Sequence, residues 1–250
     1  MTSRYFEGAK HALDYAKFRP TPCPALISSI INFLNTKLPS EKHDCCIDVG
    51  CGSGQSTHCL APHCFLPSEK HDCCIDVGCG SGQSTHCLAP HFKRVVGVDV
   101  SPAQIQIAQD AQKPSNVTYQ VCEAEKLPVE AGSVQLVNSC QACHWFNLPA
   151  FFAEADRVLV PGGVVALHGY KLPEFVNHPD KDKAQSILMQ FYEGELAGCW
   201  AKERFEVDEG YTDDRFRIPY PDFFRQDGFG EPRTVRLQDV AGLLRSWSGY

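Results

Sequence analysis

The run Cys74-Ile75-Asp76-Val77-Gly78-Cys79-Gly80-Ser81-Gly82 has the pattern of a buried β-strand that ends in a glycine-rich loop. Helix-compatible residues follow from Gln83 to Leu88. In such a strand–loop–helix unit, glycines let the backbone turn tightly and approach a ligand, whose polar groups meet free N–H donors. A dinucleotide fingerprint would need glycine at position 83, where this chain has Gln83. The loop therefore favours a ligand other than a pyrophosphate.

A second element of the predicted site is Asp99, which lies 17 residues after Gly82 at the end of the next predicted strand. A carboxylate at that place can accept hydrogen bonds from both hydroxyls of a ribose. An aspartate at a strand end can also simply cap the following helix, and a glycine-rich turn can be purely structural. The joint spacing of the two elements favours a nucleoside site.

Strand and helix patterns alternate after the glycine loop. Predicted strands are Arg94–Asp99, Val117–Val121, Ser133–Asn138 and Gly163–His168. Ser101-Pro102 is a helix start, Phe151–Leu159 reads as a second helix, and Leu26 to Leu34 has helical spacing upstream. This order predicts an α/β fold with a doubly wound, mainly parallel, Rossmann-like sheet and helices on both faces.

An exact repeat includes the glycine loop, because Leu38–His63 and Leu66–His91 are identical with a period of 28 residues. Two identical units in an otherwise non-repetitive chain indicate a segmental duplication and not a solenoid. The second copy runs directly into Arg94–Asp99, so we assign the site to Asp76, Gly78, Gly80 and Gly82. The alternative is the first copy, with Asp48, Gly50, Gly52 and Gly54. We expect the surplus copy, 38–65, to be a poorly packed insertion or an edge strand.

At these residues the chain resembles the class I S-adenosylmethionine-dependent methyltransferases. The likeness runs from about Tyr5 to about Gly169 and includes the Glu123-Ala124-Glu125-x-Leu127-Pro128 segment. It implies that the glycine loop meets the methionine part of S-adenosylmethionine, Asp99 the ribose, and Glu123 with Ala124 the adenine. Ser133–Val137 and the run from Gln141 to Phe146 resemble the fourth strand and its active-site end, which adds Gln141 to the cofactor site. Gln135 departs from the family, which usually has aspartate there.

The opening Tyr5-Phe6, Tyr15 and Phe18-Arg19-Pro20 resemble the trans-aconitate methyltransferase-like branch of small-molecule enzymes. That resemblance implies a lid over the cofactor that includes Tyr15 and Arg19, although these residues could equally only hold a helix on the core. We expect one domain over 1–250, with lid and helix at 1–37, the duplicated insertion at 38–65, the cofactor-binding core at 66–169 and a substrate cap at 170–250. The family's closing antiparallel strand pair is expected to be incomplete.

The predicted reaction is methyl transfer to a small-molecule acceptor, with carboxylates as one acceptor class. A carboxylate needs no general base, whereas a hydroxyl or amine needs one, for which His144 is the candidate. A lone histidine beside Trp145 and Phe146 is more often packed or substrate-orienting. Arg19, Lys171 and Arg204 are candidates for pairing with an acidic substrate. The rival interpretation is a catalytically inactive binding or scaffold protein.

Composition excludes several other classes of protein. A formal charge of −7 argues against a nucleic-acid binder, and no run is apolar enough for a membrane span. We expect a cytoplasmic protein with free thiols, because Met1 to Lys10 lacks the apolar stretch of a signal peptide. No metal is expected, because adjacent cysteines in a strand point to opposite faces. The crowded residues that raise a zinc alternative are His71, Cys73, Cys74, Cys79, His86 and Cys87.

Overall fold

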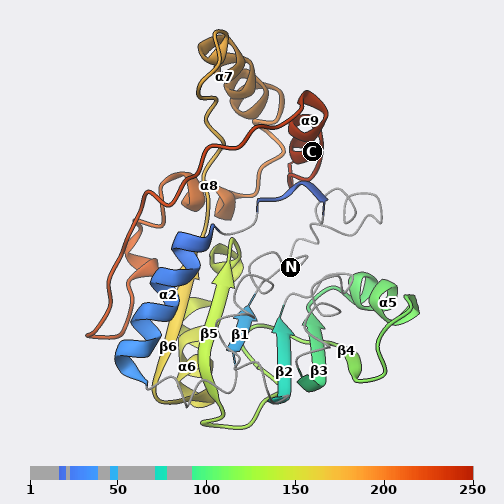
Figure 1. The fold of residues 1–250 in the computed structure, drawn as a ribbon, viewed down its shortest axis with the longest axis vertical. Coiled ribbons are helices and arrows are strands. Elements are labelled where there is room, and N and C mark those ends of the chain that lie inside the picture. Colours follow the sequence, from blue (N-terminus) through green and yellow to red (C-terminus); the bar gives the residue numbers. More distant parts are fainter. Residues whose placement is uncertain (1–16, 21–22, 39–45, 50–70, 78–91, 250) are drawn as a thin grey trace.

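A single six-stranded sheet organises the protein, seen in a computed structural model that describes residues 17–20, 23–38, 46–49, 71–77 and 92–249. The strand order is β4-β3-β2-β1-β5-β6, and every neighbouring pair is parallel (Figure 1). The strands are β1 (Cys46–Val49), β2 (His71–Val77), β3 (Phe92–Asp99), β4 (Val117–Val121), β5 (Val134–Cys140) and β6 (Leu159–His168). The predicted parallel α/β sheet is confirmed.

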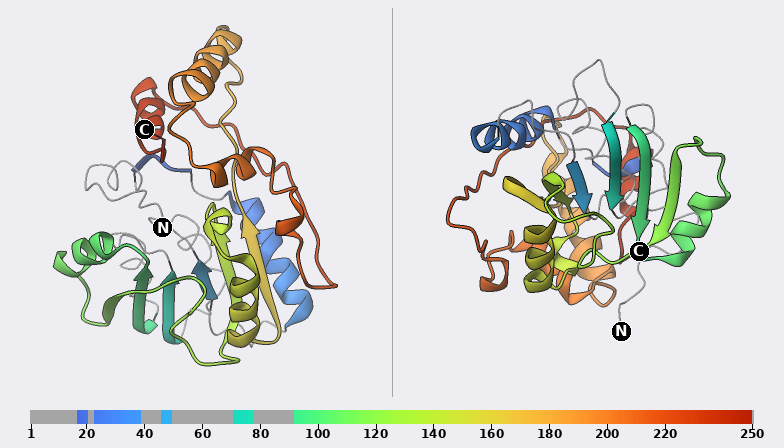
Figure 2. Two further views of the ribbon diagram at one scale, coloured as in Figure 1. Left: turned by 180° about the vertical axis from the view of Figure 1, so that it is seen from behind. Right: turned by 90° about the horizontal axis from the view of Figure 1, so that it is seen from below.

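Helices cover both faces of this sheet. Helices α2 (Pro24–Lys37) and α6 (Leu148–Val158) lie on opposite faces of its β5–β6 half, and α5 (Pro102–Asp110) packs near β3 and β4 (Figures 1 and 2). Helix α5 begins as predicted, because the Ser101 side chain accepts from the backbone N–H of Gln104. Helix α6 begins three residues earlier than predicted, because Asn147 caps it by accepting from the N–H of Ala150.

The two repeat copies lie side by side in the middle of the sheet. The first copy supplies β1 and the second supplies β2, paired so that Ile47 faces Ile75 and Asp48 faces Asp76. The surplus copy was predicted to be a poorly packed insertion or an edge strand, and this was wrong for its strand β1, which lies inside the sheet. Strand β1 pairs with β5 on its other side, so its backbone hydrogen bonds are shared with two neighbours. Any short apolar strand of suitable register can pair in this way. The repeat provides two such strands, and the sheet includes both.

The main hydrophobic core lies between the sheet and α6. Apolar residues of α6 recur at helical spacing, and Phe151, Ala155 and Val158 are fully buried. They pack with Val98 of β3 and with Val134 and Val137 of β5. This core fixes the carboxyl ends of the strands, where a ligand crevice forms in a doubly wound sheet.

The C-terminal third has most of its helices beyond the carboxyl ends of the strands, whereas its stretch around Asp222 and Gln226 runs back along α2 (Figure 1). It contains α7 (Lys181–Met189), the π-helix η4 (Gln190–Glu195), α8 (Lys202–Asp208), the 3₁₀-helix η5 (Asp214–Phe216) and α9 (Leu237–Arg245). This region has its own small core of Leu188, Tyr192, Leu196 and Trp247. Within the described residues no antiparallel strand follows β6, which stands at the end of the sheet. The sheet is therefore unclosed on that side.

Candidate functional site

Asp99 ends β3 and is held in place by the turn into α5. Its Oδ1 accepts a hydrogen bond from the Ser101 N–H at 2.8 Å, and its backbone carbonyl accepts from the Cys122 N–H at 3.0 Å. The side chain is half-buried. Asp99 thus stabilises the turn before α5, while Ser101 itself caps the helix. The carboxylate lies at the edge where the sequence predicted a ribose site.

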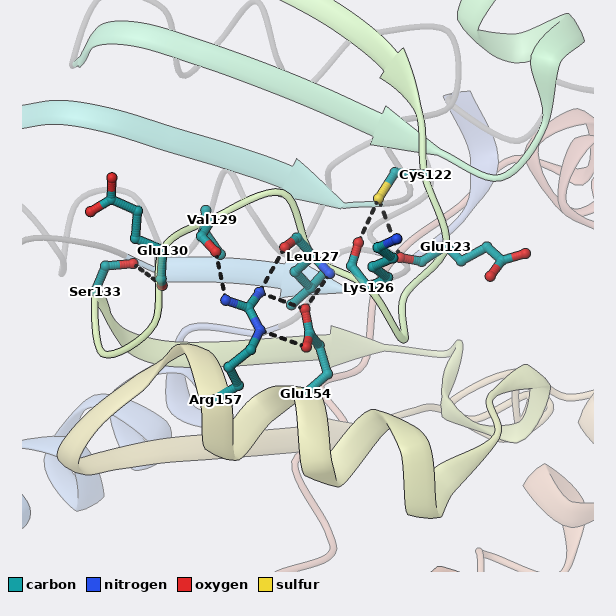
Figure 3. A network of polar contacts seen from close by, with 9 residues as sticks. All are labelled: Cys122, Glu123, Lys126, Leu127, Val129, Glu130, Ser133, Glu154 and Arg157. Carbon is teal, nitrogen blue, oxygen red and sulfur yellow. Dashed lines mark hydrogen bonds and ion pairs between the residues drawn. The ribbon is translucent and has the colours of Figure 1, made fainter.

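Glu123 and Ala124 follow β4 on a short turn at the same edge. Asp99 and Val121 are direct partners in the β3–β4 pairing. Glu123 comes two residues after Val121, so it lies close to Asp99 along this edge. The Lys126 N–H donates to the Glu123 carbonyl at 3.3 Å, and the Cys122 thiol donates to the Lys126 carbonyl at 3.0 Å (Figure 3). Glu123 is exposed and Ala124 half-buried, which leaves the carboxylate of Glu123 open to a ligand.

A network from α6 anchors the segment after this turn. Arg157 donates to the backbone carbonyls of Val129 at 2.9 Å and Leu127 at 2.8 Å, and it pairs with Glu154 at 2.7 Å (Figure 3). Glu154 in turn accepts from the Leu127 N–H, and hydrogen bonding from Arg157 lowers the pKa of Glu154. Because Arg157 and Glu154 are a helical turn apart, one face of α6 fixes the connection between β4 and β5.

Two apolar side chains flank these acidic residues and remain exposed. Val100, next to Asp99, is 57% exposed, and Val121, at the end of β4, is 52% exposed. Large hydrophobic side chains left exposed together are typical of binding surfaces, especially beside polar groups. Their position fits the flat, apolar faces of a nucleobase.

Gln141 joins the ends of β5 and β6. Its side-chain amide both donates to the Tyr170 carbonyl at 3.1 Å and accepts from the Tyr170 N–H at 2.8 Å, and its own N–H donates to the His168 carbonyl. Its φ of 56° is in the left-handed region, which costs a residue other than glycine roughly 1–3 kcal/mol. A side chain at Gly169 would approach the Gln141 Oε1 to 2.6 Å, so the amide of Gln141 could not keep its present position. The amide of Gln141 therefore fixes this edge of the site.

His144 lies in the 3₁₀-helix η3 (Cys143–Trp145) just beyond β5 and is only 3% exposed. Burial lowers its pKa to about 3, and the guanidinium groups of Arg204, Arg215 and Arg19 add to this effect. Burial likewise raises the pKa of the Cys143 thiol to about 11. At neutral pH the imidazole is uncharged and a weak base. This is the packed arrangement that the sequence left open beside catalysis.

Tyr211, which sequence reasoning missed, touches His144 from the C-terminal region. Its hydroxyl lies 3.0 Å from the Nδ1 of His144, and the two rings stack at 6.1 Å between centroids. Tyr211 lies in an irregular, aromatic-rich stretch, and no local pattern distinguishes it from neighbouring aromatics. The sequence separation of 67 positions between the partners explains why their contact could not be predicted from spacing.

The three basic candidates take different positions. Arg19 donates to the Tyr170 hydroxyl at 3.0 Å and to the Ser246 carbonyl at 2.8 Å, which connects the N-terminal segment to the β6 end and to the C-terminal region. Arg204 pairs with Asp208 at 2.9 Å and is largely buried. Lys171 is exposed, and its ammonium group passes beside Gly210. Of the three, Arg19 and Arg204 lie close enough to His144 to affect its pKa.

Several predicted site residues cannot be placed. Tyr15, Gly78, Gly80 and Gly82 lie outside the described residues, as do Gly50, Gly52 and Gly54 of the first copy. Only the backbone of Asp76 is described, on β2, where it is paired with Asp48 on one side and Gly97 on the other. The described backbone thus brings the glycine loop's strand next to the strand of Asp99.

The zinc alternative falls on side chains outside the described part of the chain. Among the side chains that are described, no group of three or more His, Cys, Asp or Glu is arranged to hold a metal ion. Cys23, Cys122, Cys143 and Cys199 are free thiols. Within the described ranges, no helix has both the length and the apolar character to cross a bilayer.

Together, the parallel sheet and the loops at its carboxyl edge define a Rossmann-like α/β protein. A family described as a methyltransferase domain matches residues 75–167, from the second repeat copy to the end of β6. A methyltransferase of Dictyostelium discoideum is 37% identical over 95% of this chain and 74% of its own length. A malonyl-[acyl-carrier protein] O-methyltransferase of Hahella chejuensis is 44% identical over 47% of this chain, which is a third of that protein's length.

Among solved structures, a type II methyltransferase from Anaeromyxobacter dehalogenans superposes with a TM-score of 0.56 and 29% identity. The superposition covers 93% of this chain and 80% of that one. The chain belongs to the class I S-adenosylmethionine-dependent methyltransferases. Its cofactor is accordingly S-adenosylmethionine. The trans-aconitate-like branch stays a prediction.

Proposed function

We propose that this protein transfers the methyl group of S-adenosylmethionine to a carboxylate of a small-molecule acceptor. The observation that carries the proposal is the buried, uncharged His144 at the end of β5, which is too weak a base to deprotonate a hydroxyl or an amine. A carboxylate is already ionised at neutral pH and needs no base. The Hahella relative, by its name, is an O-methyltransferase that acts on a malonyl group.

We assign the cofactor to the β2–β4 part of the edge. Asp99 accepts from the ribose hydroxyls, Glu123 and Ala124 meet the adenine, and Val100 and Val121 offer apolar surface beside it. These acceptor and apolar groups fit a nucleoside. The loop of Asp76, Gly78, Gly80 and Gly82 receives the methionine part, a choice supported by the pairing of β2 with β3 and by a family match that begins at residue 75.

The acceptor half of the site lies between β5, β6 and the C-terminal region. Gln141 keeps the ends of β5 and β6 together through Tyr170, and Arg19 links Tyr170 to the C-terminal region. Phe18 packs directly against Gly242 of α9, where any side chain would clash with its ring. These contacts support a lid that contains Arg19 and a substrate cap over 170–250. Tyr15, the other residue of the predicted lid, lies outside the described residues.

Methyl transfer requires little of the protein beyond aligning the acceptor with the methyl group. S-adenosylmethionine, when bound, would supply a methyl group that is activated for transfer by its sulfonium charge. The residues of this chain hold the acceptor in line and exclude water. Cys143, which is buried beside His144, offers no competing nucleophile, because its thiol stays protonated.

Two measurements test this proposal. Calorimetric titration of the full chain with S-adenosylhomocysteine should give micromolar affinity, whereas no binding at millimolar ligand would favour the inactive scaffold. Transfer from labelled S-adenosylmethionine should then be screened across carboxylate, phenol and amine libraries. Methylation of carboxylates is expected. Methylation confined to phenols or amines would contradict the acceptor class while leaving the methyltransferase activity intact.

A further inference from the structure

The side chain of Glu125 connects the cofactor half of the strand edge to the acceptor half. Glu125 follows Glu123 and Ala124 on the turn after β4. Its Oε1 accepts a hydrogen bond from the backbone N–H of Asn147 at 2.9 Å. Asn147 comes directly before α6 and shortly after η3, the 3₁₀-helix that contains His144. The bond therefore joins two loops that belong to different halves of the proposed site.

The position of Asn147 at a helix start favours a carboxylate as its partner. Asn147 is the N-cap of α6, where its side chain accepts from the Ala150 N–H at 3.4 Å and its carbonyl from the Phe151 N–H at 2.8 Å. A negative charge beside the first turn of a helix interacts favourably with the helix dipole. A hydrogen bond to a carboxylate is also about twice as strong as one between neutral groups. Half-buried Glu125 therefore holds the start of α6 against the cofactor turn.

The connection from β4 to β5 is attached to α6 at a second place. Arg157 donates to the carbonyls of Leu127 and Val129, and Glu154 accepts from the Leu127 N–H (Figure 3). Arg157 and Glu154 belong to the second half of α6, away from η3. The bond of Glu125 is at the start of the helix instead. The two attachments can therefore be removed separately.

The start of α6 is continuous with η3, so its position affects that of His144. The Phe146 N–H donates to the Cys143 carbonyl at 3.1 Å, which closes the turn of η3. The next N–H along the chain is that of Asn147, whose partner is Glu125. His144 is buried inside this short turn. A displacement of Asn147 is thus passed to the backbone that carries His144.

We propose that Glu125 is a positioning residue that couples cofactor binding to the geometry of the acceptor half. With an adenine against Glu123 and Ala124, the turn after β4 has less freedom, so less conformational entropy is lost when Glu125 holds the Asn147 N–H. The start of α6 and η3 are then fixed before an acceptor arrives. Such coupling is reciprocal, so the same bond strengthens cofactor binding. The inference rests on the proposed function, in particular on the adenine lying at this turn.

Hydrogen exchange of the Asn147 amide tests the proposal in the full chain. NMR compares the exchange rates with and without saturating S-adenosylhomocysteine. The amide of Leu159, which donates to the Ala155 carbonyl at the other end of α6, reports the overall stabilisation by the ligand. After division by the change at Leu159, the ligand should slow exchange at Asn147 by roughly fivefold or more in the wild type, the usual size of coupling between two sites.

Three variants separate positioning from a merely structural role. Glu125→Ala removes the acceptor of the hydrogen bond and should lose this extra slowing at Asn147, although saturating S-adenosylhomocysteine still binds. Glu125→Gln keeps an oxygen that can accept the same N–H and should restore part of the slowing. Glu154→Ala detaches the turn from the second half of α6 and should show the slowing of the wild type.

Equal slowing at Asn147 in Glu125→Ala and the wild type overturns the proposal, as does an equal loss of slowing in Glu125→Ala and Glu154→Ala. A wild-type chain that binds S-adenosylhomocysteine without extra slowing at Asn147 overturns it before any variant is made. A wild-type chain that does not bind S-adenosylhomocysteine contradicts the proposed function instead.

The ring of His144 gives a second readout, which follows the coupling into η3. Its ¹⁵N signals should shift when S-adenosylhomocysteine binds to the wild type and to Glu154→Ala, and should stay in place in Glu125→Ala. Shifts of equal size in all three proteins would show that ligand binding reaches His144 without Glu125, which overturns the positioning role.

Discussion

The two repeat copies have the same amino-acid sequence, but their strands lie beside different strands of the sheet. Strand β1, from the first copy, lies between β2 and β5, whereas β2, from the second copy, lies between β1 and β3. Their β-propensities are identical, so propensity cannot have decided which copy takes which place. The choice comes from connectivity, because the second copy leads directly into β3 along the chain. In the proposed site, one copy therefore adjoins the cofactor half and the other adjoins the acceptor half.

The pair also has a geometric consequence. With both copies in the sheet, two strands separate β3, which carries Asp99, from β5, which leads to Gln141 and His144. A single copy would bring these halves closer by one strand spacing, about 4.8 Å. A reaction that needs a methyl group and an acceptor in line is sensitive to displacements of this size.

The largest expected effect comes from placing the same substitution in each copy. Gly80→Val should abolish binding of S-adenosylhomocysteine, a loss on the order of a thousandfold or about 4 kcal/mol, because the side chain blocks backbone approach to the ligand. Gly52→Val, its exact counterpart, should retain binding, since its copy adjoins β5. Calorimetry on both full-length variants measures this, with circular dichroism as the folding control. The reverse pattern would transfer the site to Asp48, Gly50, Gly52 and Gly54.

The second expected effect comes from deleting one of the two repeat copies. Deletion of 38–65 leaves a single copy, which can pair with β3 and β5 at once. Cofactor binding should persist, and kcat/KM for the methylated carboxylate should rise by roughly a hundredfold, because the two halves approach each other. Labelled methyl transfer by full chain and deletion variant gives the ratio. Loss of folding on deletion would show that both copies are structurally required, and an unchanged rate would show that their separation is harmless.

The sequence predicted the elements that depend on local pattern. Val117–Val121 has the bounds predicted from its β-branched alternation, and Ser101 caps α5 as its place before Pro102 indicated. Asp99 and Glu123 were placed at one edge because parallel strands end together. What failed was the position of the first copy, since centre or edge depends on which partner strand is available. The contact of Tyr211 with His144 was missed for a related reason, because the two residues are far apart in the chain.

A smaller effect is expected from replacing Asp99. This variant tests whether β3, the strand beside the second copy, carries part of the cofactor site. Asp99→Ala should weaken S-adenosylhomocysteine binding by about 1–3 kcal/mol, the cost of losing a charged hydrogen-bond acceptor. Asp110→Ala is a suitable control, because Asp110 is exposed at the end of α5 and accepts only from a Gln106 side chain among the described contacts. Unchanged affinity in folded Asp99→Ala would refute the ribose assignment and leave Asp99 as a structural turn residue.

The smallest expected effect is a dependence of the free energy of unfolding on pH. It comes from two histidines near the ends of β5 and β6, the part of the sheet beside the first copy. Burial lowers the pKa of His144 to about 3 and that of His168 to about 4, below the ordinary value of 6.5. Below pH 6.5 these histidines bind protons in the unfolded chain but stay neutral in the folded chain. The folded state is therefore most stable above pH 6.5, and this stability is lost as the pH falls toward 4. Between pH 6.5 and 5.5 the free energy of unfolding should fall by about 1 kcal/mol for each of these histidines. Urea unfolding of wild type and His144→Gln across this range measures the difference. The variant should lose one histidine's share of the slope, and an identical slope in both proteins would show that His144 titrates normally and is not held neutral against Tyr211.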